Sequence, residues 1–150
     1  MNNINRVIFA SGSGTSRSPM ATAIFHSFPH SRPIICESRG LIVQFPEPLN
    51  QKAEAVLISN GIELKDYSSK QLQESDFSEN TLVITMEEIQ RQKILSEYTN
   101  ATEENTRLLN ELVGDELEVM DPYGGSVQTY GLCYEILKVS IEKLIKLLET

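Results

Sequence analysis

The chain has 150 residues, 40% of them hydrophobic, which fits one domain with a buried core, and we expect a single domain spanning 1–150. Its formal net charge of -8 and pI near 4.8 argue against a nucleic-acid partner, because binding a phosphate backbone needs clustered Lys and Arg. No apolar run approaches the roughly 18 residues that span a bilayer, and Cys36 and Cys133 lack the spacing of a disulfide framework or a zinc site. We therefore expect a cytoplasmic monomer or weak dimer with no membrane partner, no metal and no cofactor.

The first predicted elements are a strand, a small-residue loop and a helix. The apolar run of Arg6–Ala10 is typical of a central parallel strand that is covered on both faces. The small residues from Ser11 to Ser16 let the backbone curl so that its N–H groups point inward, and Arg17 closes the loop. Pro19 suits the first turn of a helix that stops by Pro29. A helix start directly after such a loop predicts an anion cradle.

Further elements alternate along the chain. A short strand is predicted from Pro33 to Ser38 and broken by Arg39–Gly40, and the chain to Pro48 has the composition of a loop. Later come a helix over Pro48–Asn60, a turn leading to a short helix or coil at Tyr67–Leu72, a buried strand over Thr81–Met86, a helix from Glu87 to about Glu97, a short strand at Thr106–Leu109 and a long amphipathic helix from Val127 to the chain end. This order predicts a three-layer, Rossmann-like α/β fold with a four-stranded parallel sheet and helices on both faces. Ligands of such sheets bind beyond the carboxyl ends of the strands, where the phosphate loop after strand one would lie.

Two motifs together resemble the low-molecular-weight protein tyrosine phosphatases. That family's signature is a strand, a Cys, five residues, then Arg-Ser-Pro-Met-Ala and a helix, and here Ser11 is followed by five residues and by Arg17-Ser18-Pro19-Met20-Ala21. Asp121-Pro122-Tyr123 before the long final helix is similar to the family's acid loop. Ser68–Leu72 and the strand ending at Met86 also resemble segments of that family.

The resemblance implies a role for each matching residue. In the family a thiolate attacks phosphorus, and an aspartic acid protonates the leaving phenolate. Mapped onto this chain, Arg17 would clamp the phosphoryl group, Asp121 would be the general acid, Ser18 would support the nucleophile, and Tyr123 would form an aromatic wall. The phosphate-binding residues would be Gly12, Ser13, Gly14, Thr15, Ser16, Arg17 and Ser18, and the partner would be phosphate or a protein or peptide bearing phosphotyrosine.

The nucleophile position is the main departure from the family pattern. Ser11 stands where the family has its reactive Cys, and the hydroxyl of a serine stays neutral where a cysteine would ionise. Serine nucleophiles depend on an adjacent base, commonly His, but His26 and His30 fall at or beyond the end of the first helix. We therefore expect a pseudophosphatase that holds phosphate or phosphotyrosine but is catalytically impaired.

Other readings of the sequence remain. Ser13-Gly14 and Ser16 replace the family's usual Gly-Asn pair and second Cys, so a naturally degenerate loop accounts for more of the changes than a laboratory substitution of Ser11 alone. The alternative is an active phosphatase, either one whose native Cys has been altered or one that uses Ser11 weakly. A third reading is a nucleotide- or partner-binding α/β domain, although the chain lacks the Gly-Lys-Ser/Thr ending of a nucleotide-binding P-loop. Glu87-Glu88 and Glu103-Glu104 are interpreted as solvated faces or helix starts.

Overall fold

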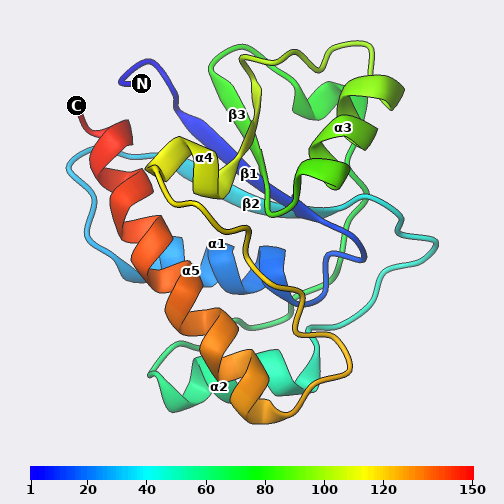
Figure 1. The fold of residues 1–150 in the computed structure, drawn as a ribbon, viewed down its shortest axis with the longest axis vertical. Coiled ribbons are helices and arrows are strands. Elements are labelled where there is room, and N and C mark those ends of the chain that lie inside the picture. Colours follow the sequence, from blue (N-terminus) through cyan, green and yellow to red (C-terminus); the bar gives the residue numbers. More distant parts are fainter.

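A computed structural model describes all residues from 1 to 150. Its single sheet is parallel, with strand order β2-β1-β3-β4 (Figure 1). The strands are β1 (Arg6–Ser11), β2 (Ile35–Gly40), β3 (Thr81–Thr85) and β4 (Thr106–Leu108). The α-helices are α1 (Arg17–Ser27), α2 (Gln51–Ser59), α3 (Glu88–Glu97), α4 (Leu109–Val113) and α5 (Val127–Leu148), with one 3-10 turn at Glu74–Asp76. The predicted four-stranded α/β fold is therefore confirmed.

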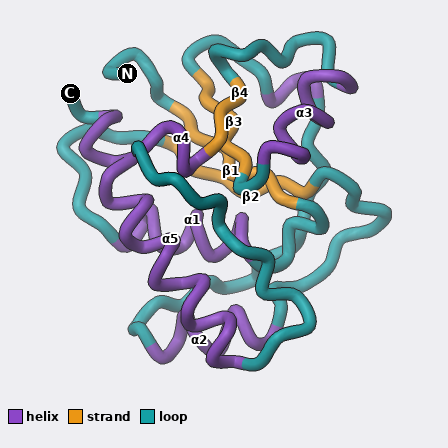
Figure 2. Tube along the Cα trace, viewed as in Figure 1, coloured by secondary structure: helices purple, strands orange, loops and turns teal.

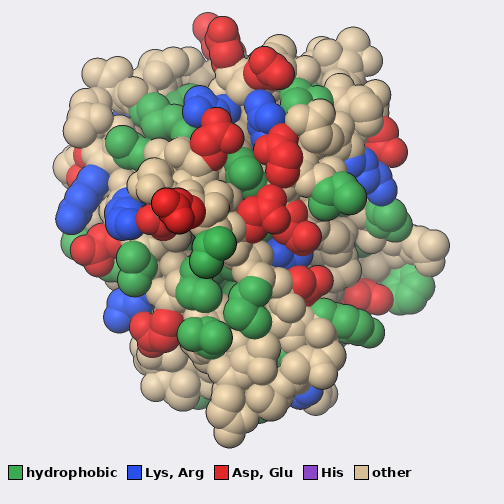
Figure 3. All heavy atoms as spheres, in the orientation of Figure 1, with side chains coloured by type: hydrophobic (Ala, Val, Ile, Leu, Met, Phe, Trp, Pro, Cys, Tyr) green, Lys and Arg blue, Asp and Glu red, His purple; other side chains and the backbone are tan.

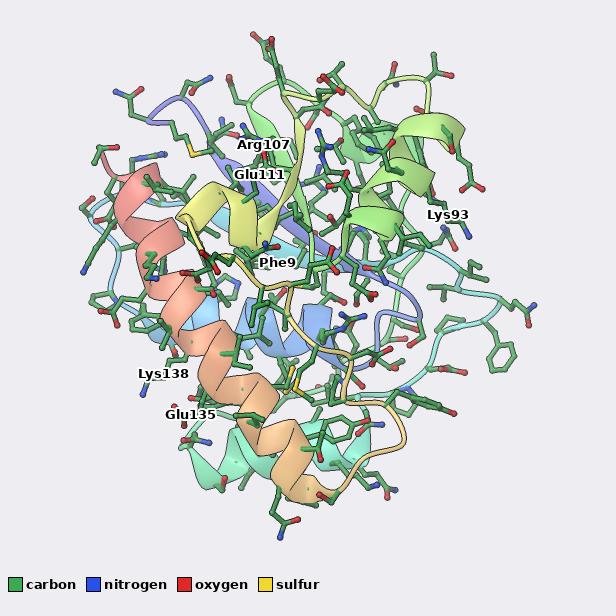
Figure 4. The ribbon with its side chains drawn as sticks, viewed as in Figure 1. Phe9, Lys93, Arg107, Glu111, Glu135 and Lys138 are labelled. Carbon is green, nitrogen blue, oxygen red and sulfur yellow. The ribbon has the colours of Figure 1, made fainter.

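The sheet lies between two unequal helical layers (Figure 2). Helices α1 and α5 cover one face, with α2 packed against α5, and α3 covers the other face. The larger core is on the α1 and α5 side, where the ring of Phe9 from β1 meets the ring of Phe25 from α1 at 6.4 Å between centroids. Phe9 is fully buried, whereas Glu135 and Lys138 project outward from α5 (Figure 4). A smaller core on the opposite face includes Ile8, Val83 and Ile94.

Local sequence signals explain where several helices begin. The side chain of Asn50 accepts hydrogen bonds from the backbone N–H groups of Lys52 and Ala53 and so caps α2. The side chain of Ser126 accepts from the N–H of Thr129 and caps α5 in the same way. The spacing of buried residues along α5, from Tyr130 to Leu148, follows the period of a helix with one buried face.

Most of the predicted elements are confirmed, but the predicted ends of β2 and β4 are wrong and one helix was not predicted. Strand β2 does not stop before Arg39–Gly40, because these residues are buried and pair with Ala10 and Ser11 of β1. Helix α4, which follows β4 directly, was not predicted, and it begins at Leu109, which was expected to end the strand. Its five residues are too few to show a periodic pattern in the sequence.

The surface carries the acidic excess expected from the composition. On the face shown in Figure 3, acidic side chains gather near the middle and hydrophobic side chains gather over α5. None of the helices is both long enough and apolar enough to cross a membrane.

Candidate active site

The candidate site is the loop that joins the carboxyl end of β1 to the first turn of α1. Ser11 ends the central strand β1 and Arg17 is the first residue of α1. Gly14 makes the sharp bend between them, with a φ of 72° that side-chain-bearing residues rarely adopt. The bend lies so close to β2 that a Cβ on Gly14 would be 2.9 Å from the backbone nitrogen of Gly40. The loop therefore curls against the end of the neighbouring strand.

Five of the six carbonyl groups from Ser11 to Ser16 accept hydrogen bonds from groups outside the loop. The carbonyls of Ser11 and Gly12 accept from the N–H of Leu41, and Gly12 also accepts from Ile42. The carbonyl of Thr15 accepts from the N–H of Asn50, that of Ser16 from the N–H of Met20, and that of Gly14 from the hydroxyl of Tyr67.

The N–H groups of the same loop are unpartnered. None of the backbone N–H groups from Gly12 to Ser16 donates a hydrogen bond within the protein. In a trans peptide the C=O and the N–H point in opposite directions, so bonding the carbonyls on the outside turns the N–H groups inward. Inward-facing N–H groups at a helix start form an anion-binding concavity.

Arg17 closes this concavity and is held from two other segments. Its side chain is 4% exposed, so it is not a solvated surface arginine. Its Nη1 donates to the carbonyl of Val119 at 2.9 Å, and its Nη2 donates to Oε1 of Glu87 at 2.6 Å. A guanidinium group has more N–H donors than these two contacts use, and the remaining donors are available to the pocket that Arg17 lines.

Ser11 lies at the bottom of the pocket with its proton directed inward. The residue as a whole is 4% exposed, and its hydroxyl donates a hydrogen bond to Oγ of Ser18 at 2.8 Å. Ser18 itself is fully buried behind the loop. Because the only proton of the Ser11 hydroxyl is donated to Ser18, the oxygen lone pairs remain available to a bound group.

The pocket has a volume of about 420 Å³. It brings together eight of the predicted site residues: Ser11, Gly12, Ser13, Thr15, Ser16, Arg17, Asp121 and Tyr123. Two predicted phosphate-binding residues, Gly14 and Ser18, do not line it. Gly14 supplies the bend, and Ser18 supports Ser11 from behind.

Asp121 and Tyr123 lie at the rim of the pocket. Oδ1 of Asp121 accepts from the backbone N–H of Tyr123 at 3.0 Å, as in an Asx turn, and Oδ2 lies 3.7 Å from Nη2 of Arg17. The side chain of Asp121 is 56% exposed and Tyr123 is 83% exposed, so both can reach a ligand that enters from solvent.

Glu47, Gln90 and Glu87 belong to this site although the sequence did not single them out for it. Glu47 and Gln90 line the pocket, and the Oε1 atom of Gln90 is buried without a hydrogen-bond partner. Glu87 was interpreted as a solvated face or a helix start; it does immediately precede α3, and its carboxylate also pairs with Arg17, which was not expected. The sequence does place Glu87 two residues after the end of β3, where side chains reach the ligand edge of a parallel sheet, but the partner was not evident.

None of the histidines and cysteines lines the pocket. Nε2 of His26 bonds to the carbonyl of Cys36, and Nε2 of His30 bonds to the carbonyl of Phe25. Both cysteines are free and buried, and burial raises the pKa of Cys133 to about 12. No histidine therefore neighbours Ser11, and neither cysteine lines the pocket in its place.

Comparisons with known proteins agree with this geometry. Residues 6–150 match the family model of the low molecular weight phosphotyrosine protein phosphatases. The low molecular weight protein-tyrosine-phosphatase PtpB of Staphylococcus haemolyticus is 30% identical over 93% of this chain and 96% of its own length. A protein-arginine-phosphatase of Bacillus subtilis is 31% identical over 95% of this chain and 96% of its own length.

A solved structure extends the similarity to the backbone. A mutant of YwlE arginine phosphatase, with serine in place of cysteine and a phosphorylated active-site serine, superposes with a TM-score of 0.86. It is 28% identical and the match covers 97% of this chain and 96% of that one. The chain belongs to the low molecular weight phosphotyrosine protein phosphatase family.

Proposed function

We propose that this protein binds a phosphorylated protein side chain in the 11–17 loop and that Ser11 keeps its turnover far below that of a cysteine phosphatase. The observation that carries the proposal is the set of inward, unpartnered N–H groups from Gly12 to Ser16 together with the buried guanidinium of Arg17. Such donors match the equatorial oxygens of one phosphoryl group.

Low turnover follows from the chemistry of Ser11. A cysteine in this loop would ionise, because N–H donors, a helix start and an arginine all favour the thiolate. A serine hydroxyl needs a base to remove its proton, and the hydrogen-bond partner of Ser11 Oγ is another hydroxyl, that of Ser18 at 2.8 Å. Asp121 would serve as the general acid if a leaving group were protonated, since it lies at the open side of the pocket.

Binding does not require the thiolate. A negative charge at the nucleophile position would repel a bound phosphate dianion by about 4 kcal/mol at roughly 4 Å and an effective dielectric near 20. The neutral hydroxyl of Ser11 removes this repulsion. Retention of phosphate is therefore compatible with loss of turnover.

The side chain that bears the phosphoryl group is phosphotyrosine or phosphoarginine. Tyr123 offers an aromatic face for a phenyl ring at the rim. Glu47, Gln90 and Asp121 offer acceptors suited to a guanidinium group on the same rim. The two named relatives, a protein-tyrosine-phosphatase and a protein-arginine-phosphatase, represent these two substrate classes.

A second function is a single transfer of the phosphoryl group onto Ser11. It is favoured by the related structure in which a serine at the active site carries a phosphoryl group. In this step the bond from Ser11 Oγ to phosphorus forms and the bond from phosphorus to the leaving group breaks. The hydroxyl proton of Ser11 passes to an oxygen of the transferred phosphoryl group, and the protonated carboxyl group of Asp121 gives its own proton to the leaving group. Because an alkoxide leaves phosphorus far less readily than a thiolate, the product would persist.

The test is a titration of the native protein with inorganic phosphate, a phosphotyrosine peptide and a phosphoarginine peptide. Arg17→Ala and Arg17→Lys should each weaken binding at least about tenfold, or about 1.4 kcal/mol, because neither keeps the planar fork of donors. Arg107→Ala is the control, since Arg107 lies near the opposite edge of the sheet, in a different pocket. Absence of binding at millimolar ligand, or equal binding by the Arg17 variants, would overturn the proposal.

Intact mass after incubation with each peptide tests the second function. A gain of one phosphoryl group by the native protein, absent in Ser11→Ala, supports transfer to Ser11. An unchanged mass in a protein that binds the peptide leaves binding as the function and excludes transfer.

A further inference from the structure

A chain of hydrogen-bonded hydroxyls connects the nucleophile position to the bend of the loop. Ser11 Oγ donates to Ser18 Oγ at 2.8 Å, and Ser18 Oγ is 3.1 Å from Ser38 Oγ. Ser38 Oγ lies 2.8 Å from the hydroxyl of Tyr67, and that hydroxyl donates to the carbonyl of Gly14 at 2.5 Å. The three serines are each less than 9% exposed, so water does not compete for these contacts.

The last link holds the loop where it has no other support. The bonded carbonyls of Ser11, Gly12, Thr15 and Ser16 are all held by backbone N–H groups, whereas that of Gly14 is held by a side chain. Gly14 is also the residue of this loop with a positive φ. The peptide group that joins it to Thr15 can therefore flip more easily than the others when the loop holds no ligand. Tyr67 is therefore the one side chain that fixes a carbonyl of this loop.

Fixing this carbonyl sets the direction of the next N–H. The peptide that joins Gly14 to Thr15 is planar and trans, so its N–H points away from Tyr67 when its C=O points toward it. Thr15 lines the pocket and its N–H has no partner in the protein. Burial raises the pKa of Tyr67, so its hydroxyl keeps the proton that this contact requires at neutral pH.

We propose that Tyr67 is a positioning residue for the phosphate site, which it organises by holding the Gly14 carbonyl outward and linking it through Ser38 and Ser18 to Ser11. The inference rests on the proposed function, since it names the residue that preorganises the same loop. It also explains how the loop keeps its curl with a glycine at position 14, where no side chain can supply an anchor.

The first test compares Tyr67→Phe with native protein in a phosphate and phosphopeptide titration. Loss of one hydrogen bond to the loop should weaken binding by about three- to tenfold. Ser38→Ala cuts the same chain one step away and should weaken binding in the same direction. Tyr98→Phe is the matched control, because Tyr98 donates to the carbonyl of Leu72 at 2.8 Å, away from the pocket.

A second readout separates positioning from general stability. In a Ser11→Cys background, the pKa of the introduced thiol can be measured from the pH dependence of its alkylation. Tyr67→Phe should raise that pKa, since the N–H of Thr15 would no longer be directed at the thiolate. Tyr98→Phe should leave the pKa unchanged. This difference should hold even if both variants lower the unfolding midpoint equally.

The outcomes distinguish this inference from the proposed function. If native protein binds phosphate, Arg17→Ala does not, and Tyr67→Phe binds as tightly as native protein with an unchanged thiol pKa, the inference is wrong and the proposed function stands. If native protein fails to bind phosphate, the proposed function fails, and the thiol pKa still decides whether Tyr67 organises the loop.

Discussion

Nη2 of Arg17 and Oε1 of Glu87 lie 2.6 Å apart although the two residues are 70 positions apart in the sequence. The contact joins the start of α1 to the residue that precedes α3, across the carboxyl ends of β1 and β3. Glu87 does not line the pocket, so it holds the guanidinium from behind and leaves the pocket itself open.

Replacing Glu87 should destabilise the protein. In Glu87→Ala the buried charge of Arg17 loses its closest partner, and since Glu87 is 30% exposed we expect a loss of about 1 to 2 kcal/mol in the free energy of unfolding. Glu87→Gln keeps an acceptor oxygen and should lose less. Saturating phosphate should recover part of the loss, because it gives Arg17 a new anionic partner.

Urea unfolding with and without phosphate measures both effects. Glu88→Ala is the control on the adjacent residue, since Glu88 pairs with Arg91 on the surface of α3 at 3.1 Å. Equal losses for Glu87→Ala and Glu88→Ala, with no recovery in phosphate, would contradict the role assigned to Glu87.

Restoring a thiol at the nucleophile position should restore turnover. The N–H donors, Arg17 and Ser18 that favour a thiolate are in place, and removing a nucleophile typically costs about 10⁴-fold or more in kcat. Ser11→Cys should therefore hydrolyse an aryl phosphate at least about 10³-fold faster than Ser11→Ala. Adding Asp121→Asn should remove about 10²-fold of that gain if Asp121 is the general acid. A Ser11→Cys protein no faster than Ser11→Ala would show that the loop is no longer a catalytic scaffold.

Much of this site could be predicted because its signals are local. The apolar run of β1, the small residues after it and the helix start at Arg17 follow one another directly, so periodicity and composition were enough to predict the order of strand, loop and helix that the structure has. The separate motif at Asp121 was placed at the same pocket only by the family resemblance, since nothing within the motif itself indicates its partner.

The residues that support the cradle could not be predicted, because they act across long sequence separations. Tyr67 reaches Gly14 from 53 positions away, and neither residue carries a local pattern that indicates the other. The extension of β2 through Arg39 was missed for a similar reason: an arginine and a glycine end a strand by local rules, but Arg39 is paired with Asp76, which is 37 positions away.

The bend at Gly14 should not tolerate a side chain. In Gly14→Ala the added Cβ would lie 2.9 Å from the nitrogen and 3.0 Å from the Cα of Gly40, at a φ of 72°. The backbone conformation alone costs about 1 to 2 kcal/mol, and relief of the contact would open the loop, so phosphate binding should be lost as well. Gly131→Ala is the control, because a Cβ there meets nothing within 4 Å on helix α5, and it should stabilise the protein by about 0.5 to 1 kcal/mol. Phosphate titration and urea unfolding of both variants check this prediction.

The buried carboxylate of Asp76 should make stability depend on pH below the neutral range. Burial by itself would raise the pKa of Asp76, but hydrogen bonds from the backbone N–H of Gln73 and from Arg39 and Arg6 outweigh it, so the pKa is lowered. A group with a lowered folded-state pKa contributes stability that is fully present above its unfolded pKa of about 3.9 and is lost as the pH falls through the folded-state value.

Asp76→Asn should therefore cost about 3 kcal/mol at pH 7, because it leaves the guanidinium of Arg39, 5% exposed, with only Glu37 as an anionic partner. The difference between native protein and Asp76→Asn should shrink steadily below about pH 4. Asp115→Asn, at a surface pair with Lys143, is the comparison and should cost less than about 1 kcal/mol. A difference between native protein and Asp76→Asn that stays constant from neutral to acid pH would show that the pKa of Asp76 is the same in the folded and the unfolded protein, so that its ion pairs do not stabilise the fold.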